Sequence, residues 1–561
     1  MDEASRRKAA SFSEQYLPKL VTVLREGYGP GALKADALAG LTVAIVALPL
    51  SMAIAIASGV GPERGLYTAI VGGFLVSLLG GSRFQIGGPA GAFIVLVAAC
   101  VAQTGVGGLL LATFLSGFVL IAAGALRLGS YIRFIPYPVT VGFTSGIAVI
   151  IFSSQIKDLL GLQLAGPEPA EIIAKLEALW AARGTVSGAA LALAAGTIAL
   201  IEAVKRWLPR WPSLLIGIVA ASVLAAGLGL PVETIGSRFG ALPRVLPAPG
   251  LPDLSMEALR AALPYALSFA LLGAIESLLS AVVADGMSGR QHRSNAELMA
   301  QGVANIGSAL FGGFCVTGTI ARTATNVRAG SRGPVSGMLH ALFLLVFLLI
   351  AAPLAAYIPL AALAALLAIV AWNMAETEEF ARLVRASRAD AMVVIVTFLL
   401  VVFRDLTEGI VVGFALGGLV FIQRMSGAAR IEPHGDGAEA GDGAENGDGA
   451  ESHDPGVVVY RLQGAFFFGA AATLGSALDR IAARPRAFVV DFTGVPFLDS
   501  SGAHAFETLA HKLHRRGAVL YLTGTSAELR RVLLAQGVRE PLARYLPDID
   551  SALAAARETA G

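Results

Sequence analysis

The sequence predicts a polytopic α-helical membrane protein with a small cytoplasmic α/β domain at its C-terminus. Of the 561 residues, 55% are hydrophobic and only 15% are charged, whereas soluble domains contain about 25% charged residues. Apolar segments recur from Leu38 to about Met425, and many reach the ~20 residues that a helix needs to span a bilayer. From Val457 onward, predicted strands (from Val457, over 487–494 and over 518–524) alternate with predicted helices (Leu474–Ala483, Ser501–Arg515 and Ala527–Gln536), which is typical of a small α/β domain.

The apolar region divides into fourteen segments, of which two are too short to cross a bilayer alone. These two, residues 90–103 and 319–330, each follow a Gly- or Pro-rich stretch. They are the third and the tenth of the fourteen, which are equivalent positions in two halves of seven. An odd number of segments per half requires inverted topology, so the sequence predicts 7+7 inverted repeats with two broken helices. Interrupted segments at matching positions indicate the substrate site of a transporter.

The distribution of charge predicts the orientation and the domain limits. Lys and Arg concentrate in alternate loops, and the positive-inside rule therefore places both termini in the cytoplasm. The first residues lack the apolar stretch and cleavage site of a secretory signal. We expect a cytoplasmic N-terminal arm (1–37), a transmembrane transport domain (38–425), an acidic Gly-rich linker (426–456) and the α/β domain (457–561).

Composition and motifs argue against several other classes of protein. The net charge of +2 gives no sign of a nucleic-acid partner. Cys100 and Cys315 lie in apolar surroundings, so a disulfide framework is not expected. The sequence has no metal-ligand spacing, nucleophile–base pair or phosphate loop. We therefore expect neither an enzyme nor a bound cofactor or metal, and we interpret His340 as a satisfied core residue.

The first broken segment contains a helix start suited to an anion. Gly87 and Gly88 precede Pro89, and Pro89 suits a first helical turn because its missing N–H would be unpaired there anyway. The small residues Ala90 and Gly91 allow a ligand to approach the backbone. Free N–H groups at a helix start carry the positive end of the helix dipole, which attracts anions.

The second broken segment adds a positive charge at membrane depth. Thr317 and Thr319 are candidate helix caps, and Arg322 lies one turn inside the predicted helix. An Arg at this depth costs ~2.5–3.5 kcal/mol on insertion scales and rarely lacks a function. We interpret Arg322 as a group that attracts the substrate; the alternative is a structural pairing that only locks the fold.

Glu276 is an acid in the middle of an apolar span. A buried carboxylate can bind and release a proton, and this would couple proton movement to anion movement. The alternative is a structural ion pair with Arg322, and both roles are compatible if protonation breaks the pair during the transport cycle.

The C-terminal domain contains one notable motif, DFTGVPFLDSSGAHAF. Asp499 and Ser500 are expected to cap a helix that begins near Ser501. The alternative is phosphorylation of Ser500 or Ser501, which would add charge at a helix start where the dipole favours it. The residues alone favour the cap.

These stretches together resemble the SulP anion-transporter family. Gly59–Phe93 resembles its sulfate-transporter signature, and Val141–Gly161 and the Arg322 segment are similar to further family motifs. DFTGVPFLDSSG resembles the STAS domain, a module of sulfate transporters and anti-sigma-factor antagonists. The resemblance implies core and gate domains, elevator-type movement and a homodimer with cytoplasmic STAS domains, which are candidate surfaces for a cytoplasmic protein partner.

Within that family, LLGAIESLLSAVVADGMSG, GTIARTATNVRAG and VAWNMAE resemble the bacterial dicarboxylate branch, which carries succinate, fumarate and aspartate. Sodium-dependent bicarbonate carriers have Asp where Glu276 stands, so the resemblance implies a proton as coupling ion rather than sodium. Leu50 and Ala90 follow the two site prolines, where chloride-binding relatives have Gln and Phe, and this implies a roomier pocket.

We therefore expect proton-coupled uptake of C4-dicarboxylates across a bacterial inner membrane. The alternatives are a sulfate or bicarbonate transporter of the same family, an anion channel or exchanger, and a membrane-anchored sensor. Glu276 is the expected proton carrier, and the expected substrate-binding residues are Ser51, Gly88, Pro89, Ala90, Gly91, Thr319, Ile320, Ala321 and Arg322.

Overall fold

The computed structural model describes residues 15–132, 136–166, 168–169, 171–209, 211–404, 406–427, 430–433, 456–466 and 486–558. The chain divides into two compact units, Met1–Phe414 and Ala415–Gly561. Each unit is described by itself below.

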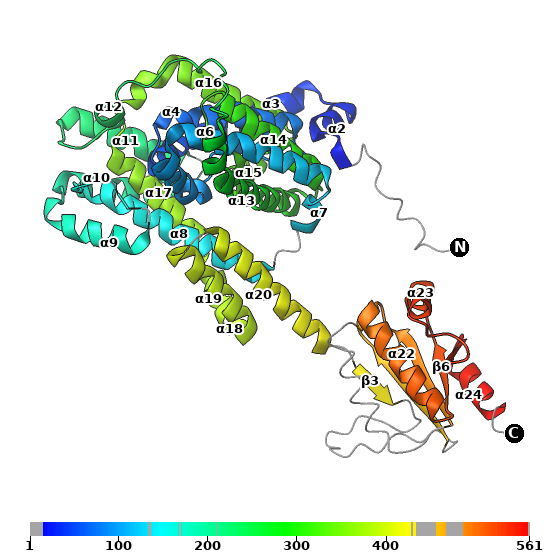
Figure 1. The fold of residues 1–561 in the computed structure, drawn as a ribbon. Helices are drawn as coiled ribbons and strands as arrows, with labels where there is room; N and C mark the ends of the chain where they lie inside the picture. Colours follow the sequence, from blue (N-terminus) through cyan, green and yellow to red (C-terminus); the bar gives the residue numbers. More distant parts are fainter. Residues whose placement is uncertain are drawn as a thin grey trace. The chain divides into compact units, whose positions relative to one another are not determined.

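Unit 1 consists almost entirely of helices, which pack into two groups (Figure 1). The core group contains α3 (Pro30–Ala57), α4 (Pro62–Tyr67), η2 (Thr68–Gly72), α5 (Gly73–Leu79), η3 (Gly91–Phe93), α6 (Ile94–Ala125), α13 (Met256–Ser288), α14 (Ser294–Leu310), α15 (Ile320–Arg328) and α16 (Val335–Ala355). The gate group contains α8 (Tyr137–Leu160), α10 (Gly188–Trp207), α11 (Ser213–Leu228), α17 (Leu360–Met374) and α19 (Arg388–Phe403). Shorter helices are α2 (Lys19–Arg25), α7 (Gly129–Ile132), α9 (Ile172–Ala181), η4 (Ala182–Thr185), α12 (Ile235–Phe239) and α18 (Thr377–Ala386), and α20 spans Leu406–Gly427.

The predicted fold class is confirmed, because each of the fourteen segments is helical. Within the described residues, eight helices are long and apolar enough to cross a membrane. The other segments use shorter or interrupted helices, such as the α4–η2–α5 run and α15. Gly105, at φ 69°, separates the third segment from the fourth within α6, and glycine adopts this conformation without the steric cost that a Cβ would add.

Small residues allow the core helices to pack closely. Where α6 crosses α14, a Cβ on Gly117 would lie 2.6 Å from the carbonyl oxygen of Gly302, and a Cβ on Gly302 would lie 2.4 Å from that of Gly117. Close packing of this kind holds membrane helices together, since lipid tails are as apolar as the side chains and provide no hydrophobic driving force.

The first membrane helix begins earlier than the sequence predicted. Instead of starting at Leu38, α3 starts at Pro30, so the expected arm (1–37) includes its first turns. Asp36 anchors these first turns: it is fully buried and accepts hydrogen bonds from the Tyr28 hydroxyl (2.7 Å) and from the backbone N–H groups of Arg332 (2.5 Å) and Gly333 (3.2 Å). Burial and this hydrogen bond raise the pKa of Tyr28. Asp36 thus ties the start of α3 to the loop before α16.

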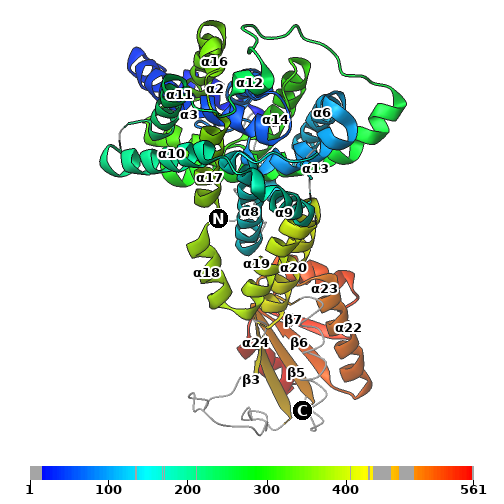
Figure 2. The same ribbon diagram turned by 90° about the vertical axis from the view of Figure 1, so that its left-hand side faces the viewer.

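Unit 2 contains a five-stranded sheet in the order β3-β4-β5-β6-β7. Its strands are β3 (Arg430–Pro433), β4 (Val457–Gln463), β5 (Ala487–Gly494), β6 (Val519–Thr523) and β7 (Ala543–Leu546). The β3–β4 pair is antiparallel and the other pairs are parallel. Side chains alternate along β5, so that Phe488 and Val490 pack with α22 (Ser500–Arg515) and α23 (Ala527–Ala535). Val489 packs with α24 (Ile549–Glu558) on the opposite face (Figure 2).

The sequence predicted part of this unit correctly. The strands beginning at Val457, Ala487 and Val519 and the helices α22 and α23 were expected, whereas β7 and α24 were not. Arg430–Pro433 falls within the expected linker but forms a strand, because it pairs with β4. The rest of the acidic linker and the helix expected over Leu474–Ala483 lie outside the described residues.

Candidate functional site

The two broken segments meet through a short antiparallel pairing. Strand β1 (Gly87–Gly88) pairs with β2 (Thr317–Gly318), with Gly87 opposite Gly318 and Gly88 opposite Thr317. Each strand leads directly into a helix start, η3 and α6 in one case and α15 in the other. The pairing therefore places side by side the two helix starts that the sequence predicted from separate halves of the chain.

The threonines of the second break do not cap α15, contrary to our expectation. The Thr319 hydroxyl donates to the carbonyl oxygen of Ile86 (3.2 Å), and the Thr317 hydroxyl donates to that of Gly273 (3.1 Å). Both side chains satisfy carbonyls of neighbouring segments instead of the first N–H groups of their own helix. The free N–H groups at the start of α15 thus stay available to a ligand.

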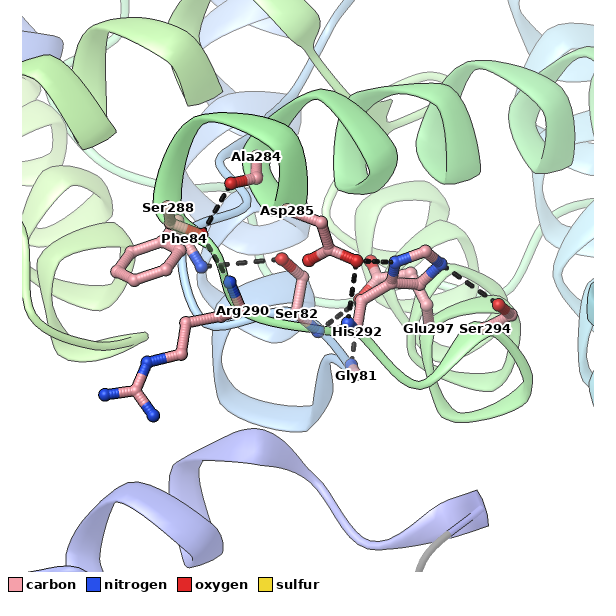
Figure 3. Close-up of polar contacts among 10 residues, drawn as sticks. All are labelled: Gly81, Ser82, Phe84, Ala284, Asp285, Ser288, Arg290, His292, Ser294 and Glu297. Atoms are coloured by element: carbon pink, nitrogen blue, oxygen red, sulfur yellow. Dashed lines mark hydrogen bonds and ion pairs between the residues drawn. The ribbon is translucent and has the colours of Figure 1, made fainter. Parts of the chain in front are cut away.

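The loop before the first broken segment is held by a buried carboxylate, that of Glu297, which sequence reasoning missed (Figure 3). Glu297 is fully buried, and its Oε2 accepts hydrogen bonds from the backbone N–H groups of Gly81 (2.8 Å) and Ser82 (3.0 Å). Its Oε1 accepts from Gln85 Nε2 (2.8 Å) and Gln301 Nε2 (3.1 Å). Each oxygen of Glu297 therefore accepts two of these hydrogen bonds, which fasten the loop residues Gly81, Ser82 and Gln85 to α14.

Gln85 extends this network to the second break and to α13. Its Nε2 also donates to the Ser277 hydroxyl (2.6 Å), and its side chain lies against Gly318, where a Cβ would be 1.9 Å from Nε2. Gly318 therefore leaves space for a side chain that links both broken segments to the helix carrying Glu276.

Arg322 is buried between the two breaks, with only 2% of its surface exposed. Its Nη2 donates to the Ser51 hydroxyl (3.2 Å) and to the carbonyl oxygen of Pro89 (3.3 Å). Its Nε and Nη1 have no hydrogen-bond partner in the described part of the chain. Burying unpaired donors of a charged group is costly, so this side chain is prepared to bind an acceptor.

A cavity of about 370 Å³ lies between the core and gate groups at this point. Its core-side lining includes Glu276 and the predicted residues Pro89, Ala90, Gly91, Thr319, Ile320, Ala321 and Arg322. Its gate-side lining includes Thr144, Ile151, Leu214 and Leu367. Two helix starts, one unpaired guanidinium and mostly apolar walls together form a site suited to a small anion.

The two remaining predicted residues lie behind the cavity, next to Arg322. Ser51 is fully buried and accepts the hydrogen bond from Nη2. Gly88 faces the other terminal nitrogen, since a Cβ built on it would lie 2.2 Å from Nη1. Both residues therefore contact the arginine rather than the cavity.

Glu276 lines the same cavity but forms no ion pair with Arg322. Only 6% of its surface is exposed, and among the described residues no carboxylate lies within ion-pair distance of Arg322. The structural ion pair that we considered as an alternative is thus not formed in this structure. The acid and the guanidinium share a cavity in which a ligand could contact both.

Gly88 provides a test of the geometry around Arg322. Gly88→Ala should leave the fold intact, because the clashing atom is the mobile end of a side chain, but it should displace the guanidinium and lower anion transport about tenfold or more. Uptake by proteoliposomes measures the effect. Gly107→Ala is the matched control, since no atom lies within 4 Å of its Cβ position; equal loss in both variants would contradict this account.

The N-cap of α22 in unit 2 is formed by Asp499. Its carboxylate accepts a hydrogen bond from the backbone N–H of Gly502 (2.7 Å). Ser500 and Ser501 occupy the exposed first turn. The cap is therefore confirmed, with Asp499 rather than Ser500 providing it.

Two broken helices that meet beside a cavity between two groups of membrane helices define an integral membrane protein with the architecture of a transporter. Comparison with known proteins identifies the family. Residues 33–397 match the sulfate permease family and residues 451–552 match the STAS domain. This chain belongs to the sulfate permease family, and it is a membrane-embedded anion transporter with a C-terminal STAS domain.

Named relatives cover nearly the whole chain. The chain is 38% identical to the putative sulfate transporter YvdB of Bacillus subtilis, over 91% of this chain and 95% of YvdB. It is 30% identical to the bicarbonate transporter BicA of a Picosynechococcus strain, over 89% of this chain and 90% of BicA. The inward-facing structure of the murine anion transporter Slc26a9 shares the fold, with a TM-score of 0.86 over 100% of this chain and 96% of that one, at 19% identity.

Proposed function

We propose that this protein is a secondary active transporter that takes up a small inorganic oxyanion, with sulfate as the first candidate substrate and bicarbonate as the second. The observation that carries the proposal is Arg322, a buried guanidinium with two unpartnered nitrogens beside two helix starts in one cavity. An oxyanion supplies several acceptor oxygens at once, so it can satisfy the guanidinium and the free N–H groups together.

The relatives favour these inorganic anions over the C4-dicarboxylates expected from the motif resemblance. One relative is named as a putative sulfate transporter and another as a bicarbonate transporter. The cavity does not by itself select among the three anions, since about 370 Å³ is ample for each of them. Succinate therefore enters the test below as a competitor.

Glu276 is the proposed proton carrier. It is buried in the same cavity as Arg322 and is not neutralised by that residue. A carboxylate that faces the substrate repels an anion when ionised and tolerates it when protonated. Anion binding should therefore favour proton binding, which is the coupling that proton symport requires.

Movement of the core group against the gate group would expose the site alternately on the two sides of the membrane. This matches the position of the cavity, whose lining comes from both groups. We further propose a homodimer in a bacterial inner membrane, with cytoplasmic termini and a STAS domain that binds a cytoplasmic protein. Phosphorylation of Ser500 or Ser501 is a second proposed input to that domain.

Competition in proteoliposomes tests the substrate assignment. Purified protein should take up radiolabelled sulfate with an inward proton gradient, and unlabelled sulfate should compete while succinate should not. Uptake of labelled bicarbonate with negligible uptake of sulfate would support the second candidate. Uptake of labelled succinate without sulfate or bicarbonate transport would overturn the proposal and restore the dicarboxylate hypothesis.

A further inference from the structure

Helix α15, which carries Arg322, is held in the core group by polar contacts. The buried residues of α15 are all polar, namely Arg322, Thr323 and Asn326. They share one face of the helix, because residues three and four positions apart are neighbours on a helix surface. Hydrogen bonds are directional, whereas apolar packing is not. The contacts of this face therefore set the rotation of α15 about its axis.

The hydroxyl oxygen of Thr323 joins three segments of the core group. It accepts hydrogen bonds from the backbone N–H of Ile86 (3.1 Å) and from the Ser280 hydroxyl (2.9 Å). Ile86 directly precedes strand β1 of the first break, and Ser280 lies one turn after Glu276 on α13. One oxygen atom thus links the helix that carries Arg322 to the first broken segment and to the helix that carries Glu276.

Asn326, one turn further along α15, adds two more contacts. Its Nδ2 donates to the carbonyl oxygen of Phe84 (2.8 Å) and to the hydroxyl of Ser336 in the first turn of α16 (2.9 Å). Each of these partners is buried. By contrast, neither ring nitrogen of the buried His340 on α16 has a hydrogen-bond partner among the described residues, so the sequence-based expectation of a satisfied core residue was wrong there.

We propose that Thr323 is a positioning residue for the anion site. Its hydroxyl oxygen fixes the rotation of α15 against the first break and α13, so that the guanidinium of Arg322 and the first N–H groups of α15 face the cavity. Thr323 is not one of the described residues that line the cavity, so it acts through its neighbour Arg322. The inference rests on the proposed function, because it requires that Arg322 binds the transported anion.

A purely stabilising role for Thr323 leads to a different expectation. Thr323→Val keeps the branched shape of the side chain but loses the acceptor, which leaves the N–H of Ile86 and the hydroxyl of Ser280 buried and unpaired. If the two hydrogen bonds only stabilise the fold, the variant should unfold at a lower temperature, but the folded protein should transport with the wild-type KM. If they position α15, the folded variant should bind the anion more weakly and show a higher KM.

The test compares Thr323→Val and Thr323→Ser with the wild type in proteoliposomes, using labelled sulfate, or labelled bicarbonate if the wild type takes up only that anion. We expect Thr323→Val to raise KM about tenfold with a smaller change in kcat. Thr323→Ser keeps the hydroxyl oxygen and should hold KM within about twofold of the wild type. Thr197→Val is the matched control and should leave KM unchanged, because the buried hydroxyl of Thr197 donates to a carbonyl of its own helix α10, that of Leu193 (2.7 Å).

A double-mutant cycle tests whether Thr323 acts through Arg322. In an Arg322→Lys background, Thr323→Val should change KM by less than about twofold, because lysine lacks the planar fork whose direction α15 sets. A further tenfold rise in this background would show that the two residues act independently and would contradict the inference.

A wild-type KM in Thr323→Val would overturn the inference, as would an equal rise in KM in Thr323→Ser and Thr323→Val. If Thr323→Val does not fold, Thr323→Cys takes its place, because a thiol is only a weak acceptor. The KM of that variant should rise severalfold, and a wild-type value would contradict the positioning role. Failure of the proposed function is recognised separately: normal uptake by an Arg322→Ala variant would remove the anion site itself, whatever Thr323 does.

Discussion

Arg322→Ala should abolish anion uptake while the protein remains folded and inserted in the membrane. Among the described residues that line the cavity, the guanidinium is the one positive side chain, and its unpaired nitrogens can donate to an anion beside the two helix starts. Removing a hydrogen-bonded charge from a desolvated site costs ~3 kcal/mol, so we expect a loss of about 100-fold in kcat/KM. Initial rates of labelled sulfate uptake measure it.

Two further variants separate charge from geometry. Arg322→Lys keeps the charge but loses the planar fork that bonds Ser51 and Pro89, and we expect only partial activity. Arg328→Ala removes an exposed arginine from the last turn of the same helix and should transport normally. The site assignment would be wrong if Arg322→Ala kept normal uptake or if Arg328→Ala lost as much activity.

Glu276→Gln should uncouple anion transport from protons. The amide resembles the protonated acid in shape and charge but cannot release a proton. We expect uptake driven by an anion gradient to continue, whereas an imposed pH gradient should no longer drive accumulation. Uptake measured across a pH series, with and without a pH gradient, separates transport driven by the anion gradient from transport driven by protons.

The control for Glu276→Gln is Glu257→Gln on the same helix. Glu257 lies in the exposed first turn of α13, so its neutralisation changes the charge of the protein without touching the cavity. Its pH profile should match that of the wild type. A Glu276→Gln variant that still concentrates sulfate in response to a pH gradient would show that another group carries the proton.

Much of the fold could be predicted from the sequence because a bilayer imposes simple constraints on it. Backbone groups in lipid must bond internally, so the long apolar segments had to be helices, and their lengths and order gave the fourteen segments. Gly87–Pro89 and Arg322 were informative for the same reason: helix-breaking residues and a charge are exceptions in such a segment and indicate a site.

The residues that support the site were harder to predict. Glu297 and Gln85 matter through pairings with segments distant in the sequence, and a single sequence does not show which segments meet. An acid in an apolar span was a visible signal, yet its partners decide its role. Thr317 and Thr319 were predicted to cap a helix from their local sequence. Their hydroxyls instead bond carbonyl groups of distant segments, because these tertiary contacts outweigh the local preference for capping.

The anion itself was the least predictable feature. Leu50 and Ala90 implied a roomier pocket, but pocket size does not distinguish a small dicarboxylate from sulfate or bicarbonate, because each presents carboxylate-like oxygens to the same donors. The named relatives therefore decided the order of candidates.

The most direct test of the central claim is whether the purified protein accumulates an anion against its gradient. Proteoliposomes with an acidic exterior and an alkaline interior should concentrate labelled sulfate above the external level, and a protonophore should abolish the accumulation. This result would establish secondary active transport. Uptake that only equilibrates the anion, and that a protonophore leaves unchanged, would instead indicate a channel and contradict the account.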